Sequence, residues 1–261
     1  MTGFISGEGF SKTFAYRNMI IQGLGTTVLL ALFTVLIGFQ LGIVLAVLRM
    51  TDIRPLRFLA YGKNGRIRSN KALVLLSKLN PVATISAIYV EGIRSTPVIV
   101  QIMLIYHGVF RRIDLPNFTI FGFIRFQRFI PGVVALGLNS AAYLCEIIRS
   151  GIQSIDGGQS EAARSLGMTK FQTLVHIILP QAIKNILPAI ANEFVVIIKE
   201  SSITYVIGVQ DLMSVVYAVQ GGQNIIMEPL LVATALYFSL CFPTSKIIAY
   251  FERKMRRGDK R

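Results

Sequence analysis

Long apolar runs dominate this chain and restrict what it can fold into. An α-helix rises about 1.5 Å per residue, so roughly 20 mostly apolar residues are needed to cross the ~30 Å apolar core of a bilayer. Five segments meet this length: residues 19–48, 82–109, 129–148, 186–207 and 229–250. Hydrophobic residues make up 53% of the sequence and charged residues only 15%, which is not the profile of a soluble domain. We therefore expect an all-α integral membrane protein with five transmembrane helices.

Lys and Arg residues are spread unevenly between these runs, and cytoplasmic loops of membrane proteins are enriched in both. Of the 27 in the chain, six fall in residues 1–18, 110–128 and 208–228. Nineteen fall in residues 49–81, 149–185 and 246–261. The asymmetry predicts an extracytoplasmic N-terminal segment, residues 1–18, and a basic cytoplasmic tail, residues 251–261. The formal net charge of +14 then follows from membrane topology, so we expect contact with the lipid bilayer and none with nucleic acid.

Two residue types that often bind metals offer no site in this sequence. Cys145 and Cys241 each lie inside an apolar run and form no spaced motif, so we interpret them as core thiols. His107 and His176 have no acidic or cysteine neighbours in a ligand pattern. We expect no metal site and no cofactor bound by the chain itself.

A polar segment, residues 150–185, separates the third and fourth runs and predicts two helices joined by a tight turn. Asp156 or Ser160 can cap the first helix. Gly167 suits the left-handed residue that ends it. Thr169, with Gln172 three positions later, forms a capping box that begins the second helix at once.

This cytoplasmic elbow has two arms, and its first arm carries small residues: Ala162, Ala163 and Gly167. Small side chains on an exposed arm would let the groove of another protein approach the backbone closely. Pro180 and Pro188 are expected to bend or break the path from the second arm into the fourth run. The alternative is an ordinary amphipathic loop that lies on the membrane surface.

Four stretches of the sequence have a recognisable spacing. They are E-A-A at 161–163 followed by Gly167 and by I-x-L-P at 177–180, YVEGIRSTPVIVQ at 89–101, NSAAYLCEIIRSGIQ at 139–153, and NEFVVIIKESSI at 192–203. Together they resemble the EAA loop and neighbouring motifs of the membrane subunits of binding-protein-dependent ABC importers, in the branch that takes up polar amino acids. Ser95 and Ser150 stand where that family usually has glycine. The resemblance covers roughly residues 23–248, and we assign no function to the N-terminal segment or to the basic linker at 54–79.

The resemblance implies a type I ABC importer permease fold in which the first arm of the elbow is a cytoplasmic coupling helix. That helix would dock on a separate ATPase subunit through Ser160, Glu161, Ala162, Ala163, Arg164, Leu166 and Gly167. ATP and its magnesium ion would bind to that partner, because this sequence contains no G-x-x-x-x-G-K-[ST] phosphate loop. We expect no enzymatic activity in the chain itself. The other expected partners are a second identical or homologous permease subunit, an extracytoplasmic solute-binding protein and the solute.

Ten polar residues within the runs are candidates for a passage through the membrane, because a charged group at the centre of the bilayer costs about 2.5–3.5 kcal/mol on insertion scales. Three of them share a sector of roughly 80° on a continuous second helix, three lie together on the third, and the rest follow the fourth. They are Glu91, Arg94 and Gln101, then Asn139, Tyr143 and Glu146, then Asn192, Lys199, Ser201 and Ser202. A broken helix near Lys199 would expose backbone groups to a solute. The alternative is that Glu91 with Arg94, and Glu146 with Arg149, form local ion pairs.

We expect the chain to move a polar amino acid inward by alternating access. The predicted outer segment before the fifth run carries Asp211 and Glu228 but no Lys or Arg, which favours cationic or neutral solutes. Two other classes remain open. One is a secondary transporter or channel that uses Glu91, Glu146 and Lys199 to couple to ions, and the other is a membrane scaffold that does not transport. Within the importer class, an opine or an ectoine-like zwitterion is an alternative solute.

Overall fold

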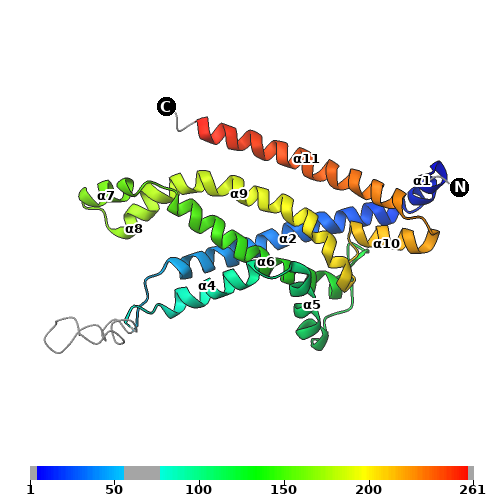
Figure 1. The fold of residues 1–261 in the computed structure, drawn as a ribbon, viewed down its shortest axis with the longest axis horizontal. Coiled ribbons are helices and arrows are strands. Elements are labelled where there is room, and N and C mark those ends of the chain that lie inside the picture. The colour runs from blue at the N-terminus through cyan, green and yellow to red at the C-terminus, as the bar shows by residue number, and fades with distance from the viewer. Residues whose placement is uncertain (1–4, 56–76, 258–261) are drawn as a thin grey trace.

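The computed structural model describes residues 5–55 and 77–257, which fold into a bundle of helices with one short hairpin (Figure 1). In chain order the elements are α1 (Gly7–Phe14), α2 (Arg17–Met50), α4 (Pro81–Arg94), α5 (Val98–Gly108), the 3-10 turn η2 (Phe110–Arg112), the strands β1 (Thr119–Ile120) and β2 (Ile124–Arg125), α6 (Phe126–Gln153), α7 (Gly157–Ser165), α8 (Lys170–Thr173), the π-helical turn η3 (Leu174–Ile178), α9 (Leu179–Glu200), the 3-10 helix η4 (Ser201–Ile207), α10 (Leu212–Gln223) and α11 (Met227–Arg257). The all-α class expected from the sequence is confirmed. Most of the basic linker at 54–79 and the outermost residues of both terminal segments lie outside the described residues.

Four helical stretches in the described part of the chain are long and apolar enough to cross a membrane: Arg17–Met50, Phe126–Gln153, Lys170–Ile207 and Met227–Met255. The bent pair α4–α5 makes a fifth when its two halves are counted as one span. The first, third and fifth apolar runs of the sequence lie within α2, α6 and α11. The fourth run is the second half of a longer helical stretch, because the second arm of the elbow continues through η3 into α9.

The second apolar run is not the continuous helix that the sequence suggested. The axes of its two halves, α4 and α5, are bent by 111° at residues 95–97. Pro97 cannot donate a backbone hydrogen bond, and its backbone is extended, with φ −64° and ψ 133°. The angular argument that placed Gln101 in one sector with Glu91 and Arg94 is therefore wrong, because it assumed an unbroken helix.

The long contact between α2 and α6 forms the centre of the bundle. Small residues allow these two backbones to approach closely: a Cβ atom added at Gly38 would lie 2.9 Å from Ser140 Cβ, and one at Gly42 would lie 2.9 Å from Leu144 Cβ. Such approach is favoured in membranes, where lipid tails compete with apolar side chains and helices gain mainly van der Waals contact from each other. A buried cluster beside this contact includes Leu30, Ile102, Phe129, Leu136 and Ile207.

Neither Pro180 nor Pro188 breaks the helical path into the fourth span, so of the bend or break expected from the sequence the break is absent. Pro180 lies in the first turn of α9, where its missing N–H is tolerated, and the π-helical turn η3 directly precedes it. Pro188 lies inside α9, which continues past it. The break expected near Lys199 is instead a tightening into the 3-10 helix η4, which ends at Gly208 with φ +84°.

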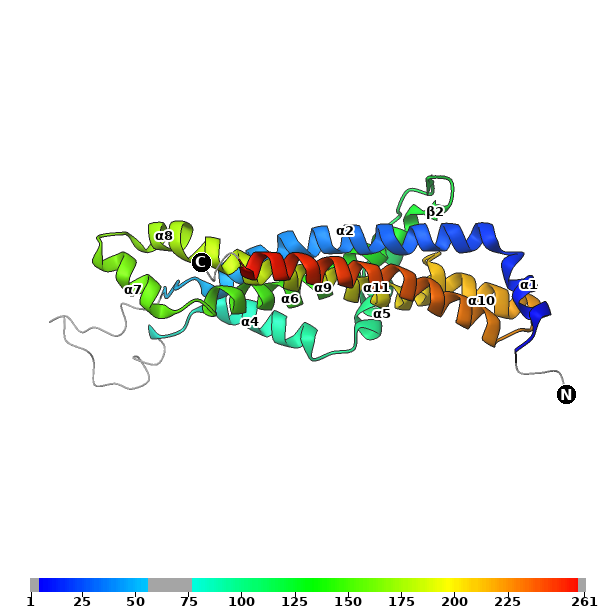
Figure 2. The same ribbon diagram turned by 90° about the horizontal axis from the view of Figure 1, so that it is seen from above.

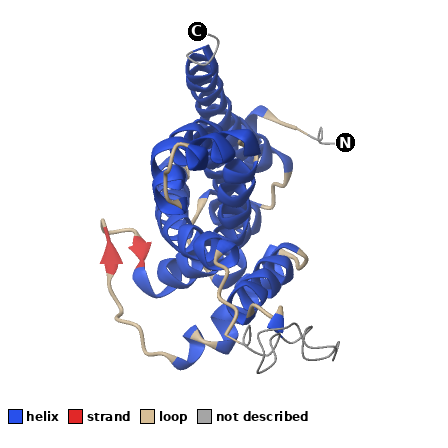
Figure 3. Ribbon diagram, turned by 90° about the vertical axis from the view of Figure 1, so that its left-hand side faces the viewer, coloured by secondary structure: helices blue, strands red, loops and turns tan. Residues whose placement is uncertain are grey.

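The molecule is elongated, and its two ends carry different elements. The elbow helices α7 and α8 lie at one end with the last turns of α11, whereas α1 and α10 lie at the other (Figure 1). At this second end the Ser6 N–H donates to Glu228 Oε1 at 2.9 Å, which joins α1 to the first turn of α11. The hairpin projects to the side of α2 (Figure 2). Figure 3, seen from the elbow end, shows the C-terminal part of α11 standing apart from the other helices.

Candidate functional site

The first arm of the elbow is a short helix, α7, that is closed at both ends by local hydrogen bonds. At its start Asp156, one of the two candidates, caps the helix by accepting the Gly158 N–H at 2.6 Å. At its end Gly167 adopts φ +87° and donates to Arg164 O at 3.0 Å, while the Met168 N–H donates to Ala163 O at 3.2 Å. This is the Schellman arrangement that a glycine permits, and it stops the helix at a defined residue.

The second arm begins with the predicted capping box, which is confirmed. Thr169 Oγ1 accepts the Gln172 N–H at 3.2 Å, and Gln172 Oε1 accepts the Thr169 N–H at 2.9 Å. Only Met168 separates the left-handed Gly167 from this cap. The two arms are therefore joined by a turn with little conformational freedom.

The elbow presents a mixed surface to its surroundings. Glu161, Ala162 and Arg164 are exposed, and the Leu166 side chain is 85% exposed. Ala163 is only 5% exposed. The expectation that all three small residues lie on the outer surface of this arm is therefore wrong for Ala163, which is covered because α7 packs against η3 and α8.

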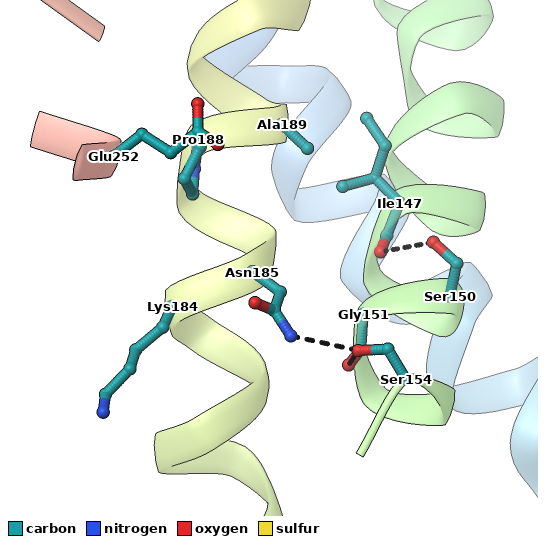
Figure 4. A pocket seen from close by; sticks show the side chains of 9 residues that line it. All are labelled: Ile147, Ser150, Gly151, Ser154, Lys184, Asn185, Pro188, Ala189 and Glu252. Atoms are coloured by element: carbon teal, nitrogen blue, oxygen red, sulfur yellow. Dashed lines mark hydrogen bonds between the residues drawn. The ribbon is translucent and has the colours of Figure 1, made fainter. Parts of the chain in front are cut away.

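A cavity of about 350 Å³ lies beside the elbow, between the elbow-side ends of α6, α9 and α11 (Figure 4). Across it the Asn185 side chain donates to Ser154 Oγ at 3.1 Å, which links α9 to the C-cap residue of α6. Lys184 and Glu252 contribute charged side chains of opposite sign to its lining. The spans on either side of the elbow are thus linked by a polar contact close to where the elbow begins.

Gln101 and Asn139, two of the candidate passage residues, are brought together at the break between α4 and α5. Asn139 Nδ2 donates to Gln101 Oε1 at 2.9 Å, and both side chains are buried. Gln101 Nε2 in turn donates to the backbone oxygens of Ile93 at 2.7 Å and of Thr96 at 3.0 Å. These bonds satisfy carbonyl groups that the end of α4 leaves without helical partners. The two amides therefore stabilise the bend, a role that the sequence interpretation did not assign to them.

A cluster of charged side chains joins the elbow-side parts of α2 and α6 to the last turn of α4. Glu146 accepts from Arg149 on its own helix, as the local ion-pair alternative predicted, and from Arg49 Nη1 at 2.9 Å. Glu91 pairs with Arg49 Nη2 at 3.4 Å instead of with Arg94. Sequence reasoning missed Arg49 because it counted this residue only among the basic residues that flank the first span.

The other candidates of the passage are placed in two groups. The Arg94 guanidinium lies over the Tyr143 ring, 5.7 Å from its centroid, beside the charged cluster. On the fourth span Asn192 and Lys199 are exposed. Their neighbours Ser201 and Ser202 donate to backbone oxygens of their own helix, those of Ile198 and Lys199. The structure therefore does not gather all ten side chains around one point.

Three acidic residues outside the candidate set are buried. The sequence assigned no role to Glu193 and placed Asp211 and Glu228 in an outer segment. Glu193, on α9, is buried and accepts from the Ser140 hydroxyl of α6 at 3.2 Å. A carboxylate inside an apolar run is a signal that could have marked it. Asp211 is fully buried as the N-cap of α10, and Glu228 is buried against Ser6. The outer negative surface inferred from Asp211 and Glu228 is therefore not present.

Within the described residues, 5–55 and 77–257, no group of three or more His, Cys, Asp or Glu side chains is placed so that it could hold a metal ion.

Comparison with known proteins agrees with this arrangement. Residues 73–257 match the family described as "Binding-protein-dependent transport system inner membrane component". This chain belongs to that family. The permease is 35% identical over 250 residues to the arginine transport system permease protein ArtQ of Bacillus subtilis (strain 168), a match that covers 96% of this chain and 98% of ArtQ. It is 32% identical over 241 residues to the probable glutamine ABC transporter permease protein GlnM of the same organism, covering 92% of this chain and 95% of GlnM.

Solved structures give the same fold. One, described as "Crystal structure of an amino acid ABC transporter with histidines", has 37% sequence identity and a TM-score of 0.76, and the match covers 94% of the permease and 98% of that chain. A chain of the MetNI methionine ABC transporter in an inward facing form has a TM-score of 0.64 at 18% identity, covering 92% of the permease and 98% of that chain. The second similarity concerns the fold alone. The expected type I ABC importer permease fold is confirmed, and the permease is a multi-pass membrane protein.

Proposed function

We propose that the permease moves a polar amino acid into the cell across the cytoplasmic membrane, driven by a separate ATPase. The observation that carries this proposal is the elbow. Its first arm is a short helix closed at both ends, with Glu161 and Leu166 exposed for docking. It follows α6 after a three-residue break at 154–156 and leads through α8 and η3 into α9 on the other side. A displacement of this rigid segment would therefore be passed to two spans at once.

An amino acid is the solute class that the relatives favour. ArtQ is named for arginine and GlnM for glutamine, and the similarities to both extend over more than nine tenths of the permease. The two named solutes differ in charge, so we propose only a polar amino acid. An opine or ectoine-like solute would need a feature of the passage that separates it from amino acids, and the described residues supply none.

The proposed assembly has several parts. Two ATPase subunits bind ATP and magnesium, two permease subunits, identical or homologous, form the passage, and an extracytoplasmic binding protein delivers the solute. The permease itself contributes docking and a path, and we propose no catalytic role for it. The passage in each subunit would run past the charged cluster of Arg49, Glu91 and Glu146 and past Arg94 and Tyr143 beside it.

We propose that the elbow faces the cytoplasm, with the C-terminus on the same side and the N-terminus outside. Most Lys and Arg residues between the spans lie in the segments that this orientation makes cytoplasmic. The elbow and the last turns of α11 share one end of the molecule (Figure 1). Both observations support the same orientation.

Reconstitution of the permease with its ATPase and binding protein in vesicles tests the proposal. Uptake of a labelled polar amino acid is expected to require ATP on the elbow side and no ion gradient. The substitution Glu161→Lys reverses the charge of an exposed elbow residue and is expected to weaken ATPase binding at least about tenfold. The readout is the amount of ATPase that co-purifies, together with uptake.

The matched control is Glu8→Lys, which reverses the charge of an exposed carboxylate on α1 at the opposite end of the molecule. This variant should retain both ATPase binding and uptake. Uptake that follows a proton gradient and ignores ATP would instead identify a secondary transporter. A complex whose ATPase activity responds to no solute would identify a scaffold.

A further inference from the structure

Arg49 connects three helices towards the elbow side of the bundle. It therefore does more than flank the first span as a basic residue. Its guanidinium, in the last turn of α2, donates through Nη1 to Glu146 of α6 and through Nη2 to Glu91 of α4. The Arg49 side chain is only 17% exposed. One planar side chain thus holds two carboxylates from two other helices, each through a different nitrogen.

The two contacts of Arg49 differ in strength. Glu146 is 23% exposed, lies 2.9 Å from Arg49 and is held a second time by Arg149. Glu91 is 61% exposed and lies 3.4 Å from Arg49. Solvent and salt screen an exposed ion pair far more than a partly buried one. The contact with Glu91 is therefore the one that breaks first, and Arg49 keeps Glu146 as a partner when it does.

The helix that Glu91 belongs to has few buried residues, and hydrogen bonds from Asn80 to Thr51 O and from Tyr89 Oη to Leu138 O of α6 at 2.8 Å also hold it to the bundle. Of the residues of α4, Ser86 and Val90 are the buried ones. Val90 packs in a cluster with Ala46 of α2 and with Cys145 of α6, directly beneath the charged residues. The bend of 111° after Arg94 turns α5 away from the axis of α4, so the two helices do not form one straight rod. A small outward movement of α4 would therefore expose this cluster without unfolding α5.

We propose that Arg49 is the positioning residue of an inner gate: its ion pair with Glu91 holds α4 closed against α2 and α6, and this pair is broken and remade in each transport cycle, while the Arg49–Glu146–Arg149 contacts persist. This proposal rests on the proposed transport function, and it assigns the regulation of the passage to one exposed ion pair. The bend at Pro97, pinned by Gln101 and Asn139, is the pivot.

The native thiol of Cys145 reports on this gate, because it is fully buried in the cluster beneath α4. In vesicles containing the full chain with Cys241→Ser, a membrane-impermeant thiol reagent is added on the elbow side. The substitution Glu91→Ala is expected to raise the rate of Cys145 modification roughly two- to fivefold, the factor that an exposed ion pair contributes. Glu91 is largely exposed, so its replacement should not prevent folding.

Salt distinguishes the ion pair from a general loosening of the structure. Raising the ionic strength should increase the modification rate of the parent protein towards that of Glu91→Ala and leave the variant unchanged. Arg49→Lys offers one nitrogen in place of two and should give the same increase, and combining it with Glu91→Ala should add nothing further. Glu8→Ala, which removes another exposed ion pair at the opposite end, should have no effect.

In the complex with its ATPase, addition of ATP is expected to change the modification rate of the parent protein and not that of Glu91→Ala. If Glu91→Ala has the same modification rate as the parent protein and the same increase of that rate with salt, the gate is overturned. This outcome is separable from failure of the proposed function. If uptake is driven by ATP but the rate of Cys145 modification does not depend on Glu91, only the gate is rejected. If that rate depends on Glu91 but uptake is not driven by ATP, the importer function is rejected and the contact that closes α4 remains.

Discussion

The carboxyl group of Asp211 is completely buried in the protein. Its side chain has no exposed surface, and it accepts backbone N–H groups of Ser214 at 3.0 Å and Met213 at 3.3 Å as the N-cap of α10. The neighbouring Leu212 N–H donates to Thr27 Oγ1 of α2 at 3.1 Å. Burial raises the pKa of Asp211 to about 7, although the backbone hydrogen bonds act in the opposite direction. This residue therefore changes its charge near neutral pH while the protein is folded.

The raised pKa predicts a pH-dependent stability. Between the ordinary pKa of 3.8 and the folded value of about 7, the folded state holds a proton that the unfolded state has released. The free energy of unfolding is therefore expected to fall as the pH rises through this range, by on the order of 2–4 kcal/mol, and to level off above it. Asp211→Asn keeps a capping side chain and should remove this part of the pH dependence of thermal unfolding in detergent.

The matched control for Asp211 is Asp156→Asn, which changes the exposed cap of α7. This variant should retain the pH slope of the parent protein. If Asp211→Asn also retains that slope, another group is responsible for it.

Individual polar residues show how far sequence reasoning reached at this scale. The sequence predicts that Gln101, Asn139 and Glu146 face away from lipid, and all three are at least partly buried within the chain. It does not indicate which groups form hydrogen bonds or ion pairs with these three side chains. Gln101 and Asn139 bond to each other and Glu146 to two arginines, since a buried polar group is satisfied equally by protein or by the water of a passage. That choice depends on contacts between residues distant in sequence, and their roles in transport stay a prediction.

At the scale of helices, the packing of α2 on α6 depends on the absence of side chains. Gly38 and Gly42 lie one turn apart on α2, and each faces α6 at a distance where a Cβ atom would press on a neighbour. The neighbour at Gly38 is the Cβ of Ser140, which cannot move without its backbone. Because Ser140 also donates to Glu193 of α9, this contact positions three spans.

The substitution Gly38→Val is therefore expected to destabilise the permease by about 1–3 kcal/mol, the usual cost of overpacking. Thermal unfolding of the purified protein in detergent should show this as a lower midpoint. Gly221→Val is the matched control, because a Cβ atom at this position of α10 meets nothing within 4 Å. Equal midpoints for the two variants would contradict a tight contact between α2 and α6.

The elements that the sequence predicted well are those with local causes. The capping box at Thr169 and the helix end at Gly167 follow from neighbouring residues, and both form as expected. The bend at Pro97 and the continuation of α9 past Pro188 do not follow from proline alone. The freed carbonyls before Pro97 find the amide of Gln101, which Asn139 of α6 holds in place. A partner from another helix thus supports the bend, and no local pattern could have indicated it.

At the scale of the whole molecule, the polar elements are separated along the long axis. The elbow and the charged cluster of Arg49 lie towards one end, whereas the buried Asp211 and the junction of Ser6 with Glu228 lie towards the other. An importer needs this separation, because docking on a motor and acceptance of the solute take place on opposite sides of the membrane. The orientation of the chain in the membrane decides which of the two ends faces the cytoplasm.

The orientation can be tested with single cysteines in cells. In a protein with Cys145→Ala and Cys241→Ser, Lys12→Cys on α1 should react with an impermeant maleimide added to intact cells. Glu161→Cys on the elbow should react only after the membrane is permeabilised. Glu161 is exposed and the Lys12 side chain is 41% exposed, so a difference in reaction reports the side of the membrane and not burial. Reaction of Glu161→Cys in intact cells would place the elbow outside, where no ATP is available to an ATPase, and would reject both the orientation and the motor-driven mechanism.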